Sequence, residues 1–232
     1  MNPLQPFADE IWIADGPEVR TLGIAFPTRM IVVRLHDGSL WINSPVEASR
    51  DEARRVEELG RVAHLVAPTP LHAWRLAQWH QFFPDARQWF APPVHRRSRG
   101  TANLLEDAPP PAWAGDLDQL VFRGNAFVNE VYFLHRASRT LVIGDFIQRY
   151  ARRPHRPVLN LAMRLGGVLD EGGVGIDIRM TFFDRRRARE SLNRLLAWDF
   201  EKVILAHGAP IERDGKSYVA RAFSWLGSAR AS

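Results

Sequence analysis

Histidine and carboxylate side chains are the groups in this sequence that could carry out chemistry. The chain has 232 residues, eight histidines and no cysteine. The lack of cysteine excludes disulfides, thiolate catalysis and cysteine-based zinc sites. The sequence also contains no GxSxG nucleophile elbow, no Walker A loop and no GxGxxG turn after a first strand. Serine-nucleophile chemistry and the common nucleotide-binding loops are therefore not indicated.

Hydrophobic patterns and turn residues predict the elements that must position these groups. Strands are predicted at 10–14, 30–35, 40–43, 62–67, 88–91, 119–122, 130–135, 140–143 and 202–205. Helices are predicted at 51–59, 71–82, 157–165, 185–198 and 215–226. Ser49 and Asp184 are expected to cap two of these helices, because their side-chain oxygens can accept from first-turn N–H groups. The glycine-rich stretch 166–175 is expected to be a flexible connection.

The order of these elements predicts an α/β (α+β) fold with four layers. Each half of the chain has a β-rich part followed by helix, strand and helix, which suits an αββα sandwich of two mixed β-sheets. A doubly wound Rossmann domain would need more regular alternation of strands and helices. Residues 92–113 hold five prolines and are predicted to be a long surface loop. Neither half would have a complete sheet alone, so residues 1–232 are expected to form a single domain.

Several segments together resemble a degenerate bacterial branch of the metallo-β-lactamase superfamily, a domain of unknown function. The segments are RMIVVRL at 29–35, LWINSPV at 40–46, HLVAPTPLHAW at 64–74 and FLHRASRTLVIGD at 133–145. In addition, TLVIGDFI at 140–147 resembles the strand that ends in the superfamily's metal-bridging aspartate, and 190–211 resembles its late helix, strand and His-Gly motif. The resemblance covers essentially the whole chain. It implies a metallo-β-lactamase-like αββα fold, in which active members use two divalent metals to activate a water.

The same resemblance implies that most of the metal ligands are missing. The first two histidines of the signature HxHxDH fall on Ala67 and Thr69, and its aspartate falls on Leu71. The histidine of the third motif falls on Asn125. None of these side chains is a good metal ligand. The metal site built from three histidines is therefore expected to be absent.

Three ligand positions of the second site are implied to survive as His72, Asp145 and His207. A one-residue shift of the alignment would put His72 on the aspartate position instead of the last histidine. Two histidines and a carboxylate with an open position can hold one catalytic zinc, iron or manganese ion. The alternative is that no metal binds and the three residues are relics, bonded to one another. In that case Asp145 could cap a following helix, and the His207 imidazole could bond to a backbone carbonyl.

Two classes of function remain open from the sequence. The first is a mononuclear metal-dependent hydrolase, with Asp145 and His207 in catalytic roles and the loop 92–113 as a lid over an unknown small-molecule substrate. The second is a catalytically inactive pseudo-enzyme that acts as a binding or scaffold protein with a protein partner. The fold does not decide between them, because function depends on the site.

Charge and hydropathy set further expectations. The net charge is +5, and arginines cluster at 95–99, 149–156 and 185–187. Nucleic-acid binding is a weaker alternative: it requires these clusters to share one face with the cleft, and they lack interleaved aromatic residues that would stack on bases. The N-terminus does not resemble a signal peptide, and no apolar stretch reaches the ~18 residues that span a bilayer. A cytoplasmic protein without a membrane anchor is expected.

Overall fold

The computed structural model describes residues 1–21, 24–94 and 103–227. One sheet has seven strands in the order β1-β2-β3-β4-β5-β6-β7. These are β1 (Gln5–Ala8), β2 (Ile11–Thr21), β3 (Ile24–Arg34), β4 (Leu40–Asn43), β5 (Val62–Ala67), β6 (Arg87–Phe90) and β7 (Asn103–Leu104). Strands β1 to β4 pair antiparallel, and β4 to β7 pair parallel. The sheet is therefore mixed.

The second sheet is also mixed and has four strands in the order β11-β10-β9-β8. These are β8 (Leu117–Phe122), β9 (Glu130–His135), β10 (Thr140–Ile143) and β11 (Lys202–Leu205). Strands β8, β9 and β10 pair antiparallel, whereas β10 and β11 pair parallel. The parallel pair matters for the site, because its two carboxyl ends lie at the same edge of the sheet.

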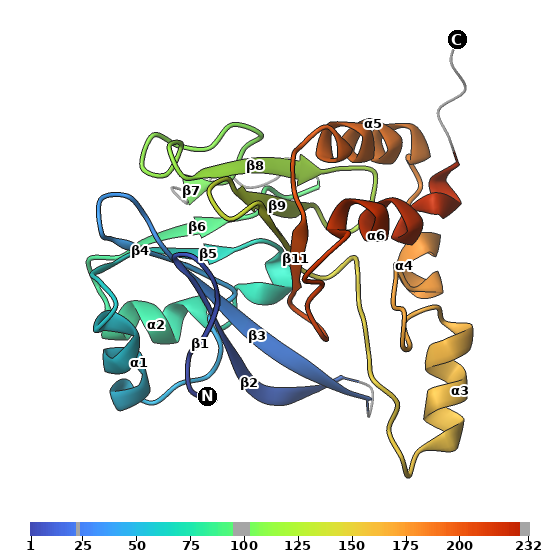
Figure 1. Cartoon of the computed structure of the whole chain (residues 1–232), viewed down its shortest axis with the longest axis horizontal. Helices are drawn as coiled ribbons and strands as arrows, with labels where there is room; N and C mark the ends of the chain where they lie inside the picture. Colours follow the sequence, from blue (N-terminus) through green and yellow to red (C-terminus); the bar gives the residue numbers. More distant parts are fainter. Residues whose placement is uncertain (22–23, 95–102, 228–232) are drawn as a thin grey trace.

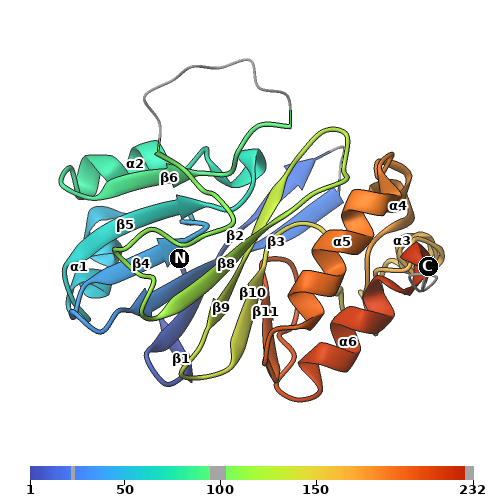
Figure 2. The ribbon, with the colours of Figure 1, turned by 90° about the horizontal axis from the view of Figure 1, so that it is seen from above.

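Helices cover the outer face of each sheet, so the molecule has four layers (Figure 2). The outer face of the seven-stranded sheet carries α1 (Arg50–Glu57) and α2 (Leu76–Phe82). The outer face of the four-stranded sheet carries α5 (Arg185–Leu196) and α6 (Gly215–Ala222), the latter followed by the 3-10 turn η2 (Ser224–Leu226). Helices α3 (Pro157–Leu165) and α4 (Ile176–Met180) lie on the same side of the molecule as α5 and α6 (Figure 1). This is the predicted αββα arrangement.

The alternation of side chains along the strands explains the layers. In β9, Val131 and Phe133 enter the core between the two sheets, while Tyr132 and Leu134 enter the core beneath α5 and α6. Successive side chains of a strand point to opposite faces, so a strand that is apolar on both faces must be covered on both. All six residues of β9 are buried.

Most predicted elements are confirmed, and the main error is next to His72. The predicted helix 71–82 is wrong in its first half: a short 3-10 turn, η1 (Pro70–His72), precedes α2, which begins only at Leu76. The alternative that Asp145 caps a following helix is also wrong, because the next helix begins at Pro157. The stretch 166–175, expected to be a connection, leads into α4, which the sequence did not predict.

Two other expectations can be compared with the structure. The loop 92–113 includes the short strand β7 and lies partly outside the described residues, as does the arginine cluster 95–99. Among the helices that the structure describes, none combines the length and apolar composition that crossing a bilayer requires.

Candidate metal centre

Asp145 and His207 are brought together by the parallel pairing of β10 and β11. In this pair Ile143 lies opposite Leu205, and the Ala206 N–H donates to the Ile143 carbonyl at 3.0 Å. Each strand is followed two residues later by a candidate ligand. Because the strands are parallel and end at paired residues, the side chains of Asp145 and His207 lie at the same edge of the sheet.

His72 comes to the same edge from the other sheet. Strand β5 ends at Ala67, and η1 turns the chain so that His72 faces the four-stranded sheet. The sheets are joined at this point by a bond from the Val131 N–H to the Pro68 carbonyl at 2.9 Å. The site is therefore built from loops at the carboxyl ends of strands in both sheets, where functional residues of open sheets commonly lie.

The three side chains converge on one carboxylate oxygen. His72 Nε2 and His207 Nε2 each lie 3.0 Å from Asp145 Oδ1. One ligand atom from each residue can be chosen so that all of them lie within 4.8 Å of one another. The three side chains are only 10% (His72), 12% (Asp145) and 13% (His207) exposed. The structure thus contains a candidate His/Asp metal site, and it brings together all three residues expected from the sequence.

Each side chain of the cluster is oriented by a second hydrogen bond, made by an atom that does not face the other two side chains. His207 Nδ1 donates to the Pro27 carbonyl at 2.7 Å, and since a carbonyl can only accept, this bond fixes the proton on Nδ1. His72 Nδ1 lies 2.6 Å from Ser44 Oγ. Thr69 Oγ1 donates to Asp145 Oδ2 at 2.5 Å, which leaves Oδ1 for the two imidazoles. Partners of this kind hold metal-binding histidines and carboxylates in many metal sites.

The electrostatics of the cluster favour an ionised aspartate. Burial would raise the pKa of Asp145, but the charges and hydrogen bonds of His72 and His207 outweigh burial and hold it well below its usual range. Burial would lower the pKa of His207, but its bonds to Asp145 and to the Pro27 carbonyl raise it instead. The Asp145 carboxylate is therefore negatively charged. It can accept from the N–H groups of the two imidazoles or bind a cation.

Glu130 is a residue of the site that the sequence reasoning missed. It is fully buried, and its carboxyl group accepts from the N–H groups of Gly144 (2.6 Å), Asp145 (3.1 Å) and Phe146 (2.8 Å). Burial and the charge of Asp145 raise the pKa of Glu130, while the three N–H groups act against this rise. Glu130 fixes the turn that aims Asp145. A carboxylate inside the apolar strand EVYFLH was the available signal, because a buried acid needs donors.

The positions expected to be lost now have other roles. Ala67 is buried apolar surface, and Leu71 is 64% exposed. Asn125 Nδ2 donates to Thr181 Oγ1 at 2.6 Å, and its Oδ1 accepts from the N–H groups of Phe127 and Val128. Asn125 therefore shapes its own loop.

The comparisons with known proteins identify the family. Residues 8–163 match the family model described as Domain of unknown function (DUF4336). The chain belongs to this family. A search of curated proteins found no match to this DUF4336 protein.

Solved structures show which fold this DUF4336 protein has. It is similar to a metallo-β-lactamase from Pontibacter korlensis, with 14% identity, 94% of this chain and 96% of that chain covered, and a TM-score of 0.61. It is also similar to a metallo-β-lactamase from Erythrobacter litoralis in the mono-zinc form, with 13% identity, coverage of 97% and 94%, and a TM-score of 0.59. A metal-soaked flavodiiron core from Synechocystis is 11% identical, with coverage of 99% and 62% and a TM-score of 0.63. The fold is that of the metallo-β-lactamases, as the sequence predicted.

Proposed function

We propose that this protein is a hydrolase that uses a single divalent metal ion held by His72, Asp145 and His207. The observation that carries the proposal is the convergence of three ligand atoms within 4.8 Å of one another. Two imidazole nitrogens and one carboxylate oxygen form the ligand set of many catalytic zinc, iron and manganese sites. The mono-zinc form of the Erythrobacter litoralis neighbour supports the idea that this fold can hold one metal alone.

The residues present fit a metal ion by chemistry and by spacing. Ligand atoms about 2.1 Å from a tetrahedral ion lie about 3.4 Å from one another. The distances of 3.0 Å from Asp145 Oδ1 to both imidazole nitrogens are close to this value, so small rotations suffice. The proton of His207 is held on Nδ1 by the Pro27 carbonyl, which directs Nε2 to the cluster. With three protein ligands, one position is left for water or substrate.

A bound ion would supply a Lewis acid and lower the pKa of a coordinated water. Asp145 would be one ligand and orients the two imidazoles. Thr69 holds the Asp145 carboxylate in position, and Glu130 holds the Asp145 backbone. Leu71 and Trp74 lie on either side of His72 in the chain and are 64% and 59% exposed. Esters and thioesters with apolar acyl groups are therefore the first substrates to screen, followed by amides and phosphodiesters.

Metal content measured by elemental analysis tests the proposal. Untagged protein, reconstituted with zinc, iron or manganese, is compared with His207→Ala and with His155→Ala, which removes an exposed histidine that is not part of the cluster. We expect about one equivalent of metal in the wild type and in the control, and loss in His207→Ala. No metal in the reconstituted wild type would refute the proposal.

A second candidate is a binding protein without metal. In its favour, Asp145 Oδ1 already accepts from both imidazoles, so the cluster is closed without an ion. Large apolar side chains are also exposed on and after α3 and α4. The most exposed are Val158 (81%), Phe183 (75%), Met180 (71%) and Leu165 (69%). Exposed apolar side chains mark interaction sites where they form one patch.

The partner in that case would carry acidic groups around an apolar centre. Residues 151–190 contain nine arginines and five acidic residues, a net charge of +4 out of +5 for the chain, so two copies of this face would repel. A metal-free protein whose pull-down partners are lost in Val158→Ser/Leu165→Ser would favour this candidate. Partner capture unchanged by those substitutions would count against it.

A further inference from the structure

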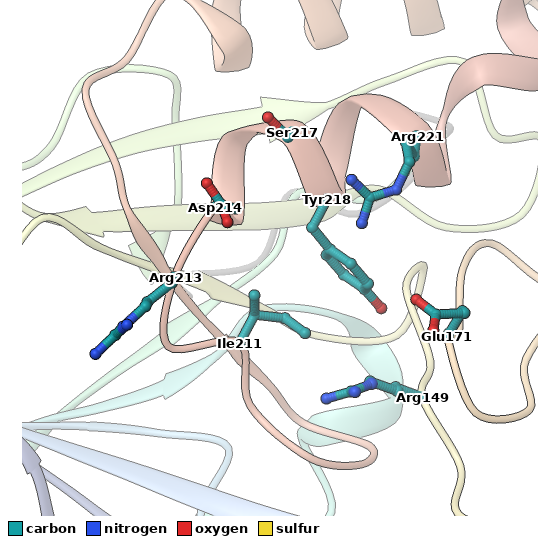
Figure 3. Close-up of a pocket in the computed structure, with 8 residues that line it drawn as sticks. All are labelled: Arg149, Glu171, Ile211, Arg213, Asp214, Ser217, Tyr218 and Arg221. Atoms are coloured by element: carbon teal, nitrogen blue, oxygen red, sulfur yellow. The ribbon is translucent and has the colours of Figure 1, made fainter.

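A cavity of about 440 Å³ adjoins α6 and contains none of the three candidate metal ligands. It is lined by Arg149, Glu171, Ile211, Arg213, Asp214, Ser217, Tyr218 and Arg221 (Figure 3). The Arg149 N–H donates to the His207 carbonyl at 3.0 Å, so one wall of the cavity adjoins the loop that carries His207. Three arginines and two acids give the lining a net positive charge.

Two arginines of this cavity, Arg149 and Arg221, form no ion pair with a carboxylate of the described residues, although Arg221 lies over the Tyr218 ring. Arg149 donates from Nε to the Asp170 carbonyl at 2.9 Å and from Nη1 to the Pro210 carbonyl at 3.4 Å, and both acceptors are backbone groups. Within residues 1–21, 24–94 and 103–227, no ion pair is formed by Arg149 or Arg221, whereas the neighbouring Arg152 pairs with Asp170 at 3.1 Å. Charged groups left unpaired around a hollow are suited to an anionic ligand.

Tyr218 provides an independent sign of a missing partner. Its side chain is 6% exposed, and its hydroxyl is buried without a hydrogen-bond partner among the described residues. Figure 3 shows this hydroxyl pointing between Glu171 and Arg149. A buried hydroxyl without a partner destabilises a protein, so a ligand that accepts from it binds more tightly. Burial raises the pKa of Tyr218 to about 12, and the phenol therefore remains a donor at neutral pH.

The start of α6 adds further donors at the same place. Asp214 precedes the helix, but its side chain does not accept from the first-turn N–H groups. Asp214 and Ser217 both line the cavity, so the first turn of α6 borders it. The Gly215 N–H already donates to the Glu201 carbonyl at 2.8 Å, so any donors for an anion come from the N–H groups that follow it in the first turn.

We propose that this cavity binds a small phosphate ester that also carries hydroxyl groups. Arg149, Arg221 and the Tyr218 hydroxyl would hold the phosphate, because together they offer charge and directed donors. The Glu171 carboxylate, on the same wall as the phenol, would accept from a hydroxyl group of the ligand. This pairing of donors with an acid distinguishes the site from one for free phosphate. The proposal does not depend on metal binding.

Isothermal titration calorimetry with ribose 5-phosphate, inorganic phosphate and ribose tests this assignment. We expect the ester to bind the full-length protein more tightly than inorganic phosphate, and ribose not to bind. Arg221→Gln, and Tyr218→Phe, which removes only the hydroxyl, should each weaken ester binding about tenfold. Arg186→Gln is the matched control, because Arg186 is exposed on α5 and pairs with Glu190.

Three results would overturn the proposal. The first is no heat of binding for the ester at up to about 10 mM. The second is equal weakening in Arg186→Gln and Arg221→Gln, which would mean non-specific attraction to a basic surface. The third is ester binding no tighter than that of inorganic phosphate, which would assign the cavity to the free anion. A Tyr218→Phe protein that keeps its folded spectrum ensures that loss of binding is not loss of structure.

Discussion

Replacing Glu130 with glutamine tests whether this residue holds the turn that positions Asp145. One oxygen of Glu130 accepts from the N–H groups of Asp145 and Phe146, and the other accepts from Gly144. A glutamine has one oxygen, which we expect to replace the one with two partners. Its amide nitrogen, a donor, then faces the Gly144 N–H, which is also a donor.

The cost follows from this one mismatch in a fully buried position. A buried donor that loses its acceptor costs about 1–3 kcal/mol, and relief of the repulsion between Glu130 and Asp145 offsets part of it. We therefore expect Glu130→Gln to lower the free energy of unfolding by about 2 kcal/mol. With a urea m-value of about 2–3 kcal/mol/M, the unfolding midpoint should fall by about 1 M. Zinc affinity should also fall, by about tenfold, because the Asp145 backbone is less well fixed.

Urea unfolding followed by circular dichroism measures the first effect, and zinc titration calorimetry measures the second. Glu57→Gln is the matched control, because Glu57 is exposed on α1. A midpoint in Glu130→Gln within about 0.3 M of the control would refute the reasoning that these hydrogen bonds hold the turn.

Three further predictions concern the surroundings of the cluster and the core. Thr69→Val removes the donor to Asp145 Oδ2 and should weaken zinc binding about tenfold in calorimetry. Gly208→Ala should lower the free energy of unfolding by more than about 3 kcal/mol in urea, because a Cβ there would lie 1.7 Å from the Arg149 carbonyl oxygen at a φ of +118°. Burial lowers the pKa of His64 from 6.5 to about 4, so the folded state resists protonation: stability is full above pH 6.5, and about 2–3 kcal/mol should be lost as the pH falls to 4. His64→Asn should remove that loss in urea unfolding measured from pH 7 to 4.

Each of these predictions has a control and a contradicting outcome. Thr28→Val removes a hydroxyl that donates to the Pro17 carbonyl, and equal zinc affinities in the two valine variants would contradict the prediction for Thr69. Gly38→Ala shares a positive φ of +79° but meets open space, so it should cost only about 1–2 kcal/mol; an equal cost at both glycines would contradict the second. If His64→Asn loses as much unfolding free energy between pH 7 and pH 4 as the wild type, groups other than His64 cause that loss.

The sequence was a good guide where local pattern and tertiary environment agree. Strands β5 and β11 have the predicted bounds, because each is a short apolar run buried on both faces. Helix α1 begins after Ser49 as expected, since Ser49 and Glu52 form a capping box. These signals depend on neighbours within a few residues.

Prediction failed where the environment decides the local structure. The segment after β5 has helical periodicity, yet residues 70–72 form a 3-10 turn, because the Thr69 and His72 side chains are bonded to Asp145 across 73 or more residues of chain. Trp74, which follows this turn, is 59% exposed. The supporting role of Ser44 had no signal in the sequence, because its partner His72 is 28 residues away. For Glu130 the sequence showed an acid within an apolar strand, but not that its partners are the N–H groups of residues 144–146.

A single substitution at Asn125 is not expected to restore the metal site that the superfamily builds from three histidines. This side chain donates to Thr181 Oγ1 and accepts from the N–H groups of Phe127 and Val128, and it is 5% exposed. An imidazole has two ring nitrogens and cannot replace one donor and a doubly accepting oxygen in this geometry. Asn125→His should therefore lower the melting temperature by about 5 °C, from about 2 kcal/mol of lost hydrogen bonding.

The same variant should not gain a metal. The other two positions of the first site hold Ala67 and Thr69, so a histidine at Asn125 would be a single ligand without companions. Calorimetric unfolding measures the stability, and elemental analysis after reconstitution counts the metal. A value near two equivalents per chain would mean that the loop can rearrange around an ion, and that its present hydrogen bonds do not decide the metal count.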